Sequence, residues 1–404
     1  MTFLLRLTLL YSKMKVGLYI HIPFCESRCI YCGFYSTTAK DWRSRYVDAL
    51  VKEMQMRRDE FERLSNDDEC FVNTIYIGGG TPSTLTITDL ERIFNTIYSI
   101  YPCNTSIKNG NTCTMTTPTS EITIEMNPDD VTPELIASMR SVGVNRISLG
   151  VQTFSDERLR FIRRRHNAAQ AMRAVETIRQ CGIENVSIDL MFGFPNETLD
   201  DWRYDLNTAL ALKPDHISAY SLMYEEGTPL HRMLTNGKIK PIDDEISLAM
   251  YTTLMDTLSA NGYEHYEISN FCLPGKRAVH NSSYWNDTPY LGFGAAAHSY
   301  NLLTRSWNIA DIKEYVRSIE NGILPSESEV IDPDTHYDDI ITTTMRTHEG
   351  VNLKHLPPEY RDYALHCAKN DIENGLLEIV GDRLRLTRQG LFVSDMVMSN
   401  LMKV

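Results

Sequence analysis

The stretch VGLYIHIPFCESRCIYC, residues 16–32, joins a predicted buried strand to a dense cysteine motif. Its first half is apolar and β-rich, and its second half places Cys25, Cys29 and Cys32 in the spacing C-x3-C-x2-C. Cysteine thiolates hold four-iron clusters, and three thiolates leave the remaining iron open to a small-molecule ligand. The spacing therefore predicts a reactive iron–sulfur site directly after the first strand.

Structural zinc and a chance spacing of buried cysteines are the alternatives for this motif. A structural zinc site is closed by four ligands, usually as paired C-x2-C knuckles, and no second knuckle occurs in the chain. Short spacings of this kind are typical of metal ligands, which disfavours a chance arrangement. The iron–sulfur cluster is the interpretation that the motif favours.

The overall composition indicates a globular protein without a nucleic-acid partner. Of the 404 residues, 42% are hydrophobic, which is enough to build the cores of two or three domains. The formal charge of −13 disfavours binding to a phosphate backbone. No stretch of the sequence approaches the roughly 20 apolar residues that a membrane-spanning helix requires.

The cysteine content and the N-terminus bear on localisation. Nine cysteines in a chain of this length do not form a disulfide framework, and a thiolate-held cluster needs a reducing compartment, so we expect a cytoplasmic protein. The apolar residues 1–10 do not predict a signal sequence, because Arg6 interrupts them and no small-residue cleavage site follows. Residues 1–14 are expected to be an N-terminal extension, with Met14 as the natural start, since the strand-like pattern begins at Lys15.

From residue 16 onward, short β-rich runs alternate with longer amphipathic runs. The predicted strands are residues 16–22, 74–77, 122–126, 146–151, 186–191 and 216–220. The predicted helices are residues 41–64, 86–100, 156–181 and 199–212, with a further helix that begins at the Thr132 cap and Pro133. Six successive β/α units predict a parallel sheet with right-handed crossovers, either doubly wound or an incomplete barrel. The polar residues 103–120 are expected to form a surface loop insertion.

Polar or glycine-rich motifs follow the predicted strands. Ligands of parallel sheets lie at the carboxyl ends of the strands, so chemistry is expected at these positions. Taken singly, each motif is typical of a turn or a cap, but their occurrence at successive strand ends predicts one shared ligand site. The motifs are GGGTPS at residues 78–83, EMNP at 125–128, QTF at 152–154, and Asp189 before FGFP at 192–195.

Together these motifs resemble those of the radical S-adenosylmethionine superfamily. More narrowly, they resemble the oxygen-independent coproporphyrinogen III oxidase group and its heme-chaperone branch, HemW, from residue 15 to the C-terminus. The resemblance implies an incomplete (β/α)6 barrel and a [4Fe-4S] cluster on Cys25, Cys29 and Cys32. It also implies that the open iron chelates S-adenosylmethionine, which one-electron reduction by an electron donor would cleave to methionine and a 5′-deoxyadenosyl radical.

The family pattern also implies which residues contact S-adenosylmethionine. Carbonyl groups suit its ammonium, a carboxylate or an amide suits the ribose hydroxyls, and an arginine suits the methionine carboxylate. Arg164 is one of three adjacent arginines, a run that is otherwise typical of a solvated helix end. The implied contacts are Tyr19, Gly79, Gly80, Thr81, Glu125, Gln152, Arg164 and Asp189.

Two local features favour the chaperone branch over the oxidases. The oxidases are expected to carry a further cysteine two positions after the third ligand, and this chain has Phe34 there. The segment HNSSYW at residues 280–285 resembles the H-N-x-x-Y-W segment of the chaperones, which implies heme contacts from His280, Tyr284 and Trp285. Histidine is a common ligand of heme iron, and aromatic rings offer flat apolar surface to a porphyrin. The alternative is that His280 is a hydrogen-bonded core histidine.

The C-terminal part predicts a separate module. Helical stretches at residues 332–347 and 359–374 precede a hairpin at residues 376–387 and a last helix, the pattern of a winged-helix-like α+β domain. From residue 321 to residue 404 there are 8 Lys and Arg against 14 Asp and Glu, which favours a lid or a protein-docking surface over DNA binding. The expected division is a barrel at residues 15–235, a barrel extension with the heme segment at 236–308 and this module at 309–404.

The leading hypothesis is a cytoplasmic heme chaperone on a radical-SAM scaffold that delivers heme to apo-proteins such as respiratory hemoproteins. The alternative is an enzyme, an oxygen-independent coproporphyrinogen III oxidase, which would decarboxylate porphyrinogen propionates after hydrogen abstraction by the deoxyadenosyl radical. No catalytic residue is assigned for that reaction. A radical-SAM enzyme that acts on RNA would need a basic surface, which the composition does not predict.

Overall fold

The computed structural model describes residues 14–64, 70–103 and 120–403. The expected N-terminal extension lies outside these ranges except for Met14, and so does the expected insertion except for its two end residues. Within the described part of the chain, no helix is long and apolar enough to cross a membrane.

Six parallel strands form the centre of the molecule, and they lie side by side in the order of the sequence. All six strands predicted from the apolar runs are present. A sheet that grows in one direction through right-handed crossovers carries its helices on one face, as a barrel does, which excludes the doubly wound alternative. The strands are β1 (Met14–Ile22), β2 (Cys70–Gly79), β3 (Glu121–Met126), β4 (Arg146–Gln152), β5 (Asn185–Phe192) and β6 (His216–Ser221).

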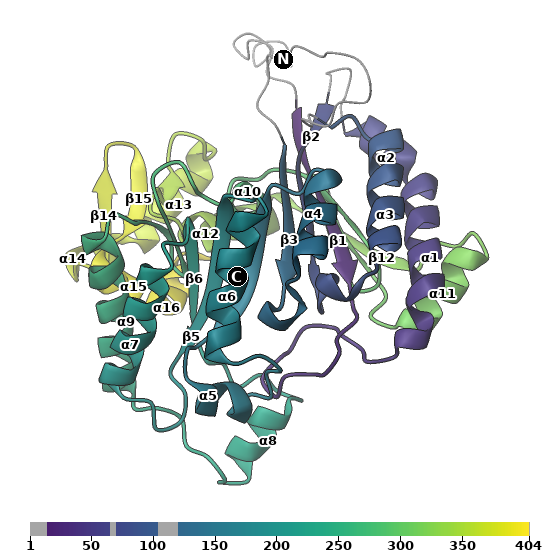
Figure 1. Cartoon of the computed structure of the whole chain (residues 1–404). Helices are drawn as coiled ribbons and strands as arrows, with labels where there is room; N and C mark the ends of the chain where they lie inside the picture. The colour runs from purple at the N-terminus through teal and green to yellow at the C-terminus, as the bar shows by residue number, and fades with distance from the viewer. Residues whose placement is uncertain (1–13, 65–69, 104–119, 404) are drawn as a thin grey trace, which may run out of the picture.

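The helices that follow the strands pack on the outer face of the sheet (Figure 1). Most of them begin at a side chain that accepts a hydrogen bond from a free backbone N–H of the first turn, as at Thr86, Thr132, Asn167 and Thr198. Leu, Ile and Val from the sheet and from these helices fill the space between the two layers. The helices are α1 (Arg43–Met56), α3 (Ile87–Ile100), α4 (Pro133–Ser141), α6 (Ala168–Gln180) and α7 (Leu199–Ala211).

Two helices that the sequence predicts as continuous are broken. The stretch 41–64 forms α1 and α2 (Arg58–Arg63), with Arg57 between them. The stretch 156–181 forms α5 (Asp156–Phe161) and α6, and Arg163 in the connection has a φ of 60°. Neither break contains Gly or Pro, and at each one an arginine side chain makes a tertiary contact, Arg57 with the carbonyl of Gly292 and Arg164 with the carbonyl of Gly150.

Further strands extend the sheet beyond both ends of the six-stranded centre, to 12 strands among the residues that the structure describes. On one side, β9 pairs with β1 in parallel, and β10, β11 and β12 follow in antiparallel pairs. On the other side, β8 and β7 continue from β6. All residues of β12 are exposed. These strands are β7 (Glu264–Glu267), β8 (Asn270–Cys272), β9 (Tyr290–Phe293), β10 (His298–Tyr300), β11 (Thr304–Asn308) and β12 (Ser326–Val330).

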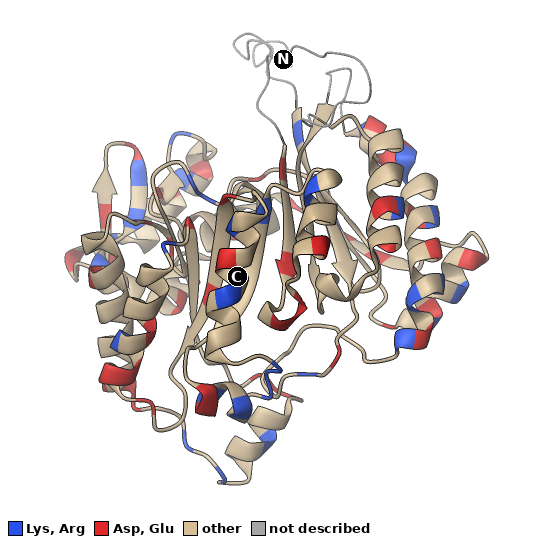
Figure 2. Ribbon diagram, in the orientation of Figure 1, with Lys and Arg blue, Asp and Glu red and all other residues tan. Residues whose placement is uncertain are grey.

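Four more helices pack against this larger sheet or connect its strands. Helix α11 (Ile312–Glu320) packs into the main core beside α1, and Arg45 pairs with Glu320 at 2.7 Å. Figure 2 shows Lys and Arg interspersed with Asp and Glu along both helices. The others are α8 (Pro229–Thr235), α9 (Asp244–Ala260) and α10 (Val279–Tyr284).

A second hydrophobic core begins at Tyr337 and includes the three-stranded sheet β13-β15-β14. Helices followed by a hairpin agree with the winged-helix-like pattern of the sequence. The division expected at residue 309 differs from the packing, since α11 and β12 lie with the main sheet. The elements here are α12 (Pro333–Thr344), β13 (Val351–Asn352), α13 (Pro358–Cys367), α14 (Lys369–Glu373), β14 (Leu377–Val380), β15 (Arg383–Leu386), α15 (Arg388–Leu391) and α16 (Ser394–Leu401).

A buried carboxylate fastens the added strands to the barrel. Glu53 of α1 is fully buried and accepts hydrogen bonds from Arg57 at 3.0 Å, Asn308 at 2.7 Å, Tyr315 at 2.6 Å and the backbone N–H of Gly294 at 2.8 Å. These partners come from the helix break, from β11, from α11 and from the turn after β9. One side chain therefore joins α1 to the turn after β9, to β11 and to α11, which all lie more than 240 residues later in the sequence.

We expect Glu53→Ala to lower the free energy of unfolding by about 3–5 kcal/mol, because it removes the buried acceptor of these hydrogen bonds and leaves the Arg57 guanidinium with only the half-exposed Glu60 as a carboxylate partner. Urea denaturation followed by circular dichroism measures the change. The control is Asp48→Ala on the same helix, where an exposed pair with Arg92 is lost and we expect less than about 1 kcal/mol. Equal effects of the two substitutions would contradict the role of Glu53.

Candidate functional site

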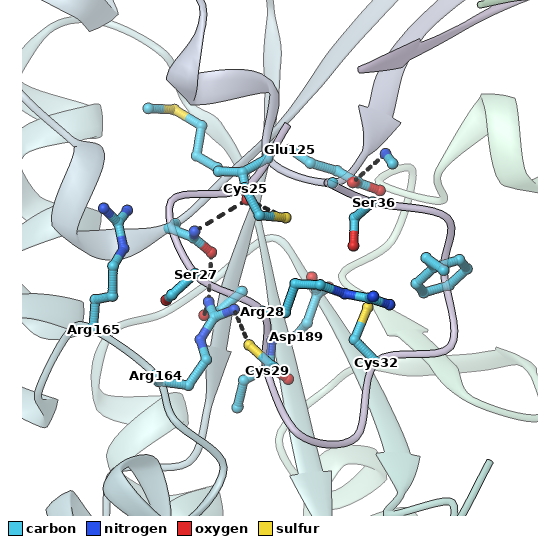
Figure 3. Close-up of a pocket in the computed structure, with 18 of the residues that line it drawn as sticks. Cys25, Ser27, Arg28, Cys29, Cys32, Ser36, Glu125, Arg164, Arg165 and Asp189 are labelled. Carbon is cyan, nitrogen blue, oxygen red and sulfur yellow. Dashed lines mark hydrogen bonds between the residues drawn. The ribbon is translucent and has the colours of Figure 1, made fainter. Parts of the chain in front are cut away.

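The three predicted cysteines line one cavity at the carboxyl ends of the parallel strands (Figure 3). The loop that carries them is anchored at its start by the buried Phe24 and in its middle by Ile30. Ile30 packs in a small apolar cluster with Ile162 and Leu230, and its backbone N–H donates to the carbonyl of Ile162 at 3.3 Å. The buried side chains of Phe24 and Ile30, which are next to Cys25 and Cys29 in the sequence, therefore hold the loop in place.

The three thiols surround the cavity and do not converge on one point. Within the described ranges, no three His, Cys, Asp or Glu side chains are placed to hold a single metal ion. A polynuclear cluster fits this donor set better than mononuclear zinc does, since each thiolate of a four-iron cluster binds a different iron. Burial raises the pKa of the Cys25 and Cys32 thiols, so binding to iron is what would favour their thiolate forms.

The turn after β2 approaches the cysteine loop so closely that only glycine fits. A Cβ atom on Gly80 would lie 2.8 Å from the carbonyl oxygen of Phe24, and one on Gly79 would lie 2.6 Å from the His21 ring. Gly79 also has a φ of 111°, which disfavours any residue with a side chain. Next to this turn, Thr81 donates a hydrogen bond to the Cys25 sulfur at 3.5 Å.

Two half-buried carboxylates face the same cavity from β3 and β5. Glu125 accepts hydrogen bonds from Tyr76 at 2.7 Å and from the backbone N–H of Gly79 at 3.1 Å, and Asp189 accepts one from Ser148 at 3.3 Å. Burial, with a contribution from the neighbouring Asp189, raises the pKa of Glu125 to about 7 against the lowering effect of the two hydrogen bonds. Burial likewise raises the pKa of Asp189 to about 6. A cationic or hydroxyl-rich ligand would satisfy both groups.

A guanidinium completes the cavity from the connection between α5 and α6. Arg164 donates to the carbonyl of Gly150 at 2.5 Å and to Asn127 at 2.7 Å, and it lies 3.7 Å from the Cys29 sulfur. Gln152 follows at the end of β4 with a φ of 69°, where the register of the strand shifts. The break of the predicted helix therefore brings this arginine to the cavity.

Seven of the eight residues expected to contact S-adenosylmethionine line this cavity, and Tyr19 does not. The Tyr19 hydroxyl lies 3.0 Å from His21 Nδ1, beneath the lining. Sequence reasoning missed Asn127 and Ser148, which hold Arg164 and Asp189 in place. The place of Asn127 in the EMNP motif, at a strand end, could have identified it as a site residue. Ser148 lies within β4, where no sequence motif marks it.

The residues expected to contact heme lie apart from this cavity. His280 is 1% exposed, its Nδ1 lies 2.8 Å from Thr74 Oγ1, and its Nε2 lies 2.9 Å from the Tyr284 hydroxyl. Burial lowers the pKa of His280 to about 3, and the nearby Arg146 contributes to the shift, so the ring is neutral. In this conformation both ring nitrogens of His280 have hydrogen-bond partners, which is the arrangement expected of a core histidine. Trp285 lines a second cavity, next to the C-terminal core.

The sequence and the fold are both similar to known proteins. Residues 19–209 match the family model of the Radical SAM superfamily. The chain is 33% identical over 385 residues to the heme chaperone HemW of Bacillus subtilis, covering 94% of this chain and 97% of the relative. It is 31% identical over 391 residues to the heme chaperone HemW of Mycobacterium tuberculosis, covering 96% and 94%.

Among solved structures, coproporphyrinogen III oxidase (HemN) from Escherichia coli, a radical SAM enzyme, has the same fold. The TM-score is 0.81 over 97% of this chain and 91% of that chain, at 21% sequence identity. An identity this low shows a shared fold and does not transfer an activity.

The raised pKa of Glu125 predicts a pH dependence of stability for the metal-free protein. Between the unfolded pKa near 4.5 and the folded value of about 7, the folded state retains a proton that the unfolded state has lost. Stability therefore falls as pH rises through this window, by on the order of 2 kcal/mol after solvent screening. Urea unfolding at pH 5 to 8 should show a smaller fall for Glu125→Gln. Glu134→Gln, exposed on α4, should keep the wild-type slope.

Proposed function

The chain belongs to the radical SAM superfamily and, within it, to the HemW family of heme chaperones, and from this premise we propose that it binds heme and delivers it to apo-proteins. Respiratory hemoproteins are the proposed acceptors. The observation that carries the proposal is the full-length similarity to curated heme chaperones, supported by a cysteine-lined cavity in which the polar groups suit the superfamily's cofactor. A thiolate-held cluster needs reducing conditions, so we propose that the protein acts in the cytoplasm.

We propose that Cys25, Cys29 and Cys32 hold a [4Fe-4S] cluster in this cavity. When bound, the cluster and S-adenosylmethionine would supply one-electron chemistry, for which an electron donor is a required partner. The loop fixes the three sulfurs through its anchors, Phe24 and Ile30, and the glycine turn presses against it from β2. The cavity lining shields the cluster position on the side of the parallel strands.

For S-adenosylmethionine we propose the lining residues that the family pattern implies. Glu125 and Asp189 would accept hydrogen bonds from hydroxyl or ammonium groups, and a positive ligand would favour their ionised forms. Arg164 would pair with the methionine carboxylate, with Asn127 holding its guanidinium in place. Backbone groups of Gly79, Gly80 and Thr81, together with Gln152 and Tyr19, complete the proposed set.

For heme we propose the HNSSYW segment, with His280 as a ligand of the iron and with Tyr284 and Trp285 as aromatic contacts. Ligation by His280 requires its Nε2 to exchange the hydrogen bond with Tyr284 for the iron. The ring is neutral, which is the form that binds metal. Because the residue is buried, the exchange also requires a movement of α10.

The second candidate function is an oxygen-independent coproporphyrinogen III oxidase, which the fold likeness to the Escherichia coli enzyme keeps open. Against it, Phe34 stands where the oxidases are expected to have a further cysteine. Phe34 lines the cavity and is 72% exposed, so it presents a large apolar side chain at the cavity mouth. We therefore place the oxidase activity second.

Anaerobic reconstitution with iron and sulfide tests the proposed cluster. Wild-type protein should bind about four irons per chain, and Cys25→Ser, Cys29→Ser and Cys32→Ser should each lose most of the iron and of the visible absorbance. Addition of S-adenosylmethionine should change the electron paramagnetic resonance spectrum of the reduced cluster. Cys367→Ser, in the C-terminal core, is the matched control. An iron content that survives all three substitutions would refute the assignment.

Hemin titration and an anaerobic porphyrinogen assay test the function itself. We expect wild-type protein to bind hemin and to form no protoporphyrinogen from coproporphyrinogen III, whereas sustained turnover would establish the oxidase. His280→Ala should weaken hemin binding by roughly tenfold or more and shift the Soret band. Thr74→Val, which removes only the hydrogen bond to Nδ1, is the control for packing. Identical spectra and affinities for wild type and His280→Ala would exclude His280 as a ligand.

A further inference from the structure

A cleft lies between the segment that follows α10 and helix α12 of the C-terminal core. Two adjoining cavities form it, and Trp285, Asp287, Ile340 and Thr344 line both. The larger of the two has a volume of about 580 Å³, against about 180 Å³ for the cavity around the cysteines. Cofactor sites span roughly 300–1,000 Å³ and favour domain interfaces, so this Trp285 cleft has the size and the place of a ligand site.

Aromatic side chains shape the Trp285 cleft for a flat ligand. The Trp285 indole has the Arg346 guanidinium 5.4 Å from its ring centroid, and its Nε1 is buried without a hydrogen-bond partner among the described residues. An unpaired buried donor is costly, which favours a ligand that supplies an acceptor. Tyr290 and Tyr300 line the smaller cavity at the other end.

A carboxylate-held histidine faces the same cleft. His336 of α12 lines the larger cavity and is 37% exposed at its side chain, and its Nε2 lies 3.1 Å from the Asp287 carboxylate. The Tyr300 hydroxyl donates to the other oxygen of the Asp287 carboxylate. Metal-binding histidines characteristically use one ring nitrogen for such a carboxylate, which orients the ring and leaves the other nitrogen for the metal.

An arginine without a carboxylate partner completes the lining. Arg383 of β15 is half-buried and donates to the carbonyl of Gly350 at 3.1 Å. Within the part of the chain that the structure describes, no Asp or Glu lies within ion-pair distance of it. Arg277 on the same lining is different, since it already pairs with Glu349 at 2.7 Å and with Glu264 at 3.4 Å. Arg383 is therefore the cation that is available to an anionic ligand.

We infer that the Trp285 cleft binds heme, an inference that rests on the proposed heme-chaperone function and assigns it a site. Trp285 covers a porphyrin face, His336 ligates the iron and Arg383 pairs with a propionate. Together these three features fit heme, which is flat, carries a metal ion and bears two carboxylates. Heme iron can bind two protein ligands, so ligation by His336 does not exclude ligation by His280. The His280→Ala titration tests that residue separately.

The test compares hemin and metal-free protoporphyrin IX on cluster-loaded protein, with Soret absorbance for the first and fluorescence for the second. His336→Ala should weaken hemin binding roughly 10–100-fold and change the Soret band, but should leave protoporphyrin binding within about twofold. Arg383→Gln should weaken both ligands by roughly tenfold with an unchanged Soret position. His366→Ala, at an exposed position of α13 outside the cleft lining, should match wild type. Circular dichroism and iron content of the cluster control for folding.

The outcomes separate this inference from the proposed function. Wild-type protein that binds no hemin refutes both. Hemin binding that is lost in His280→Ala or His366→Ala but retained in His336→Ala and Arg383→Gln overturns the Trp285 cleft alone and leaves the chaperone function standing. Equal loss of hemin and protoporphyrin in His336→Ala, with normal folding, also overturns iron ligation by this histidine.

Discussion

The site depends on a contact between two stretches of backbone. The glycine turn after β2 lies against the residues that lead from β1 into the cysteine loop, and the Gly80 N–H donates to the carbonyl of Ile22 at 2.8 Å. A Cβ atom at Gly80 would meet Pro23 and Phe24 main-chain atoms at 2.8 Å. No rearrangement of a flexible side chain relieves such a clash. The position of the three sulfurs over the parallel strands therefore depends on the absence of one methyl group.

The interior of the barrel is polar where most sheet cores are apolar. Its charged groups couple the cavity around the cysteines electrostatically to the HNSSYW segment. Arg146 is 1% exposed, and its Nε has no hydrogen-bond partner among the described residues. Its positive charge helps to keep His280 neutral on one side and lowers the pKa of Asp189 against the effect of burial on the other. Burial raises the pKa of Tyr284 in the HNSSYW segment, and the Glu125 carboxylate adds to that rise, so the charge of a cavity residue is felt electrostatically at this segment.

The sequence predicted the strands and most of the cavity residues correctly. It did not predict the features of the fold that depend on long-range contacts. Each strand is an apolar run closed by a polar motif, and parallel pairing brings those motifs together, so seven of the eight expected ligand contacts meet. The helix breaks at Arg57 and before Arg164 were missed, because no Gly or Pro marks them. A hydrogen-bonded core histidine was the alternative for His280, but the sequence could not identify Thr74 as its partner, because β2 and α10 meet only through the fold.

The exposed outer strand β12 has a consequence for the behaviour of the protein at high concentration. An open sheet edge offers unpaired backbone groups to which another molecule could add a strand. The sequence SESEV of this strand carries Glu327 and Glu329, and Arg305 of the neighbouring strand neutralises only the second, at 3.3 Å. Edge-to-edge addition of a second copy would bring these carboxylates together and bury them. Mutual repulsion along this rim thus protects a protein with an unclosed sheet from polymerising.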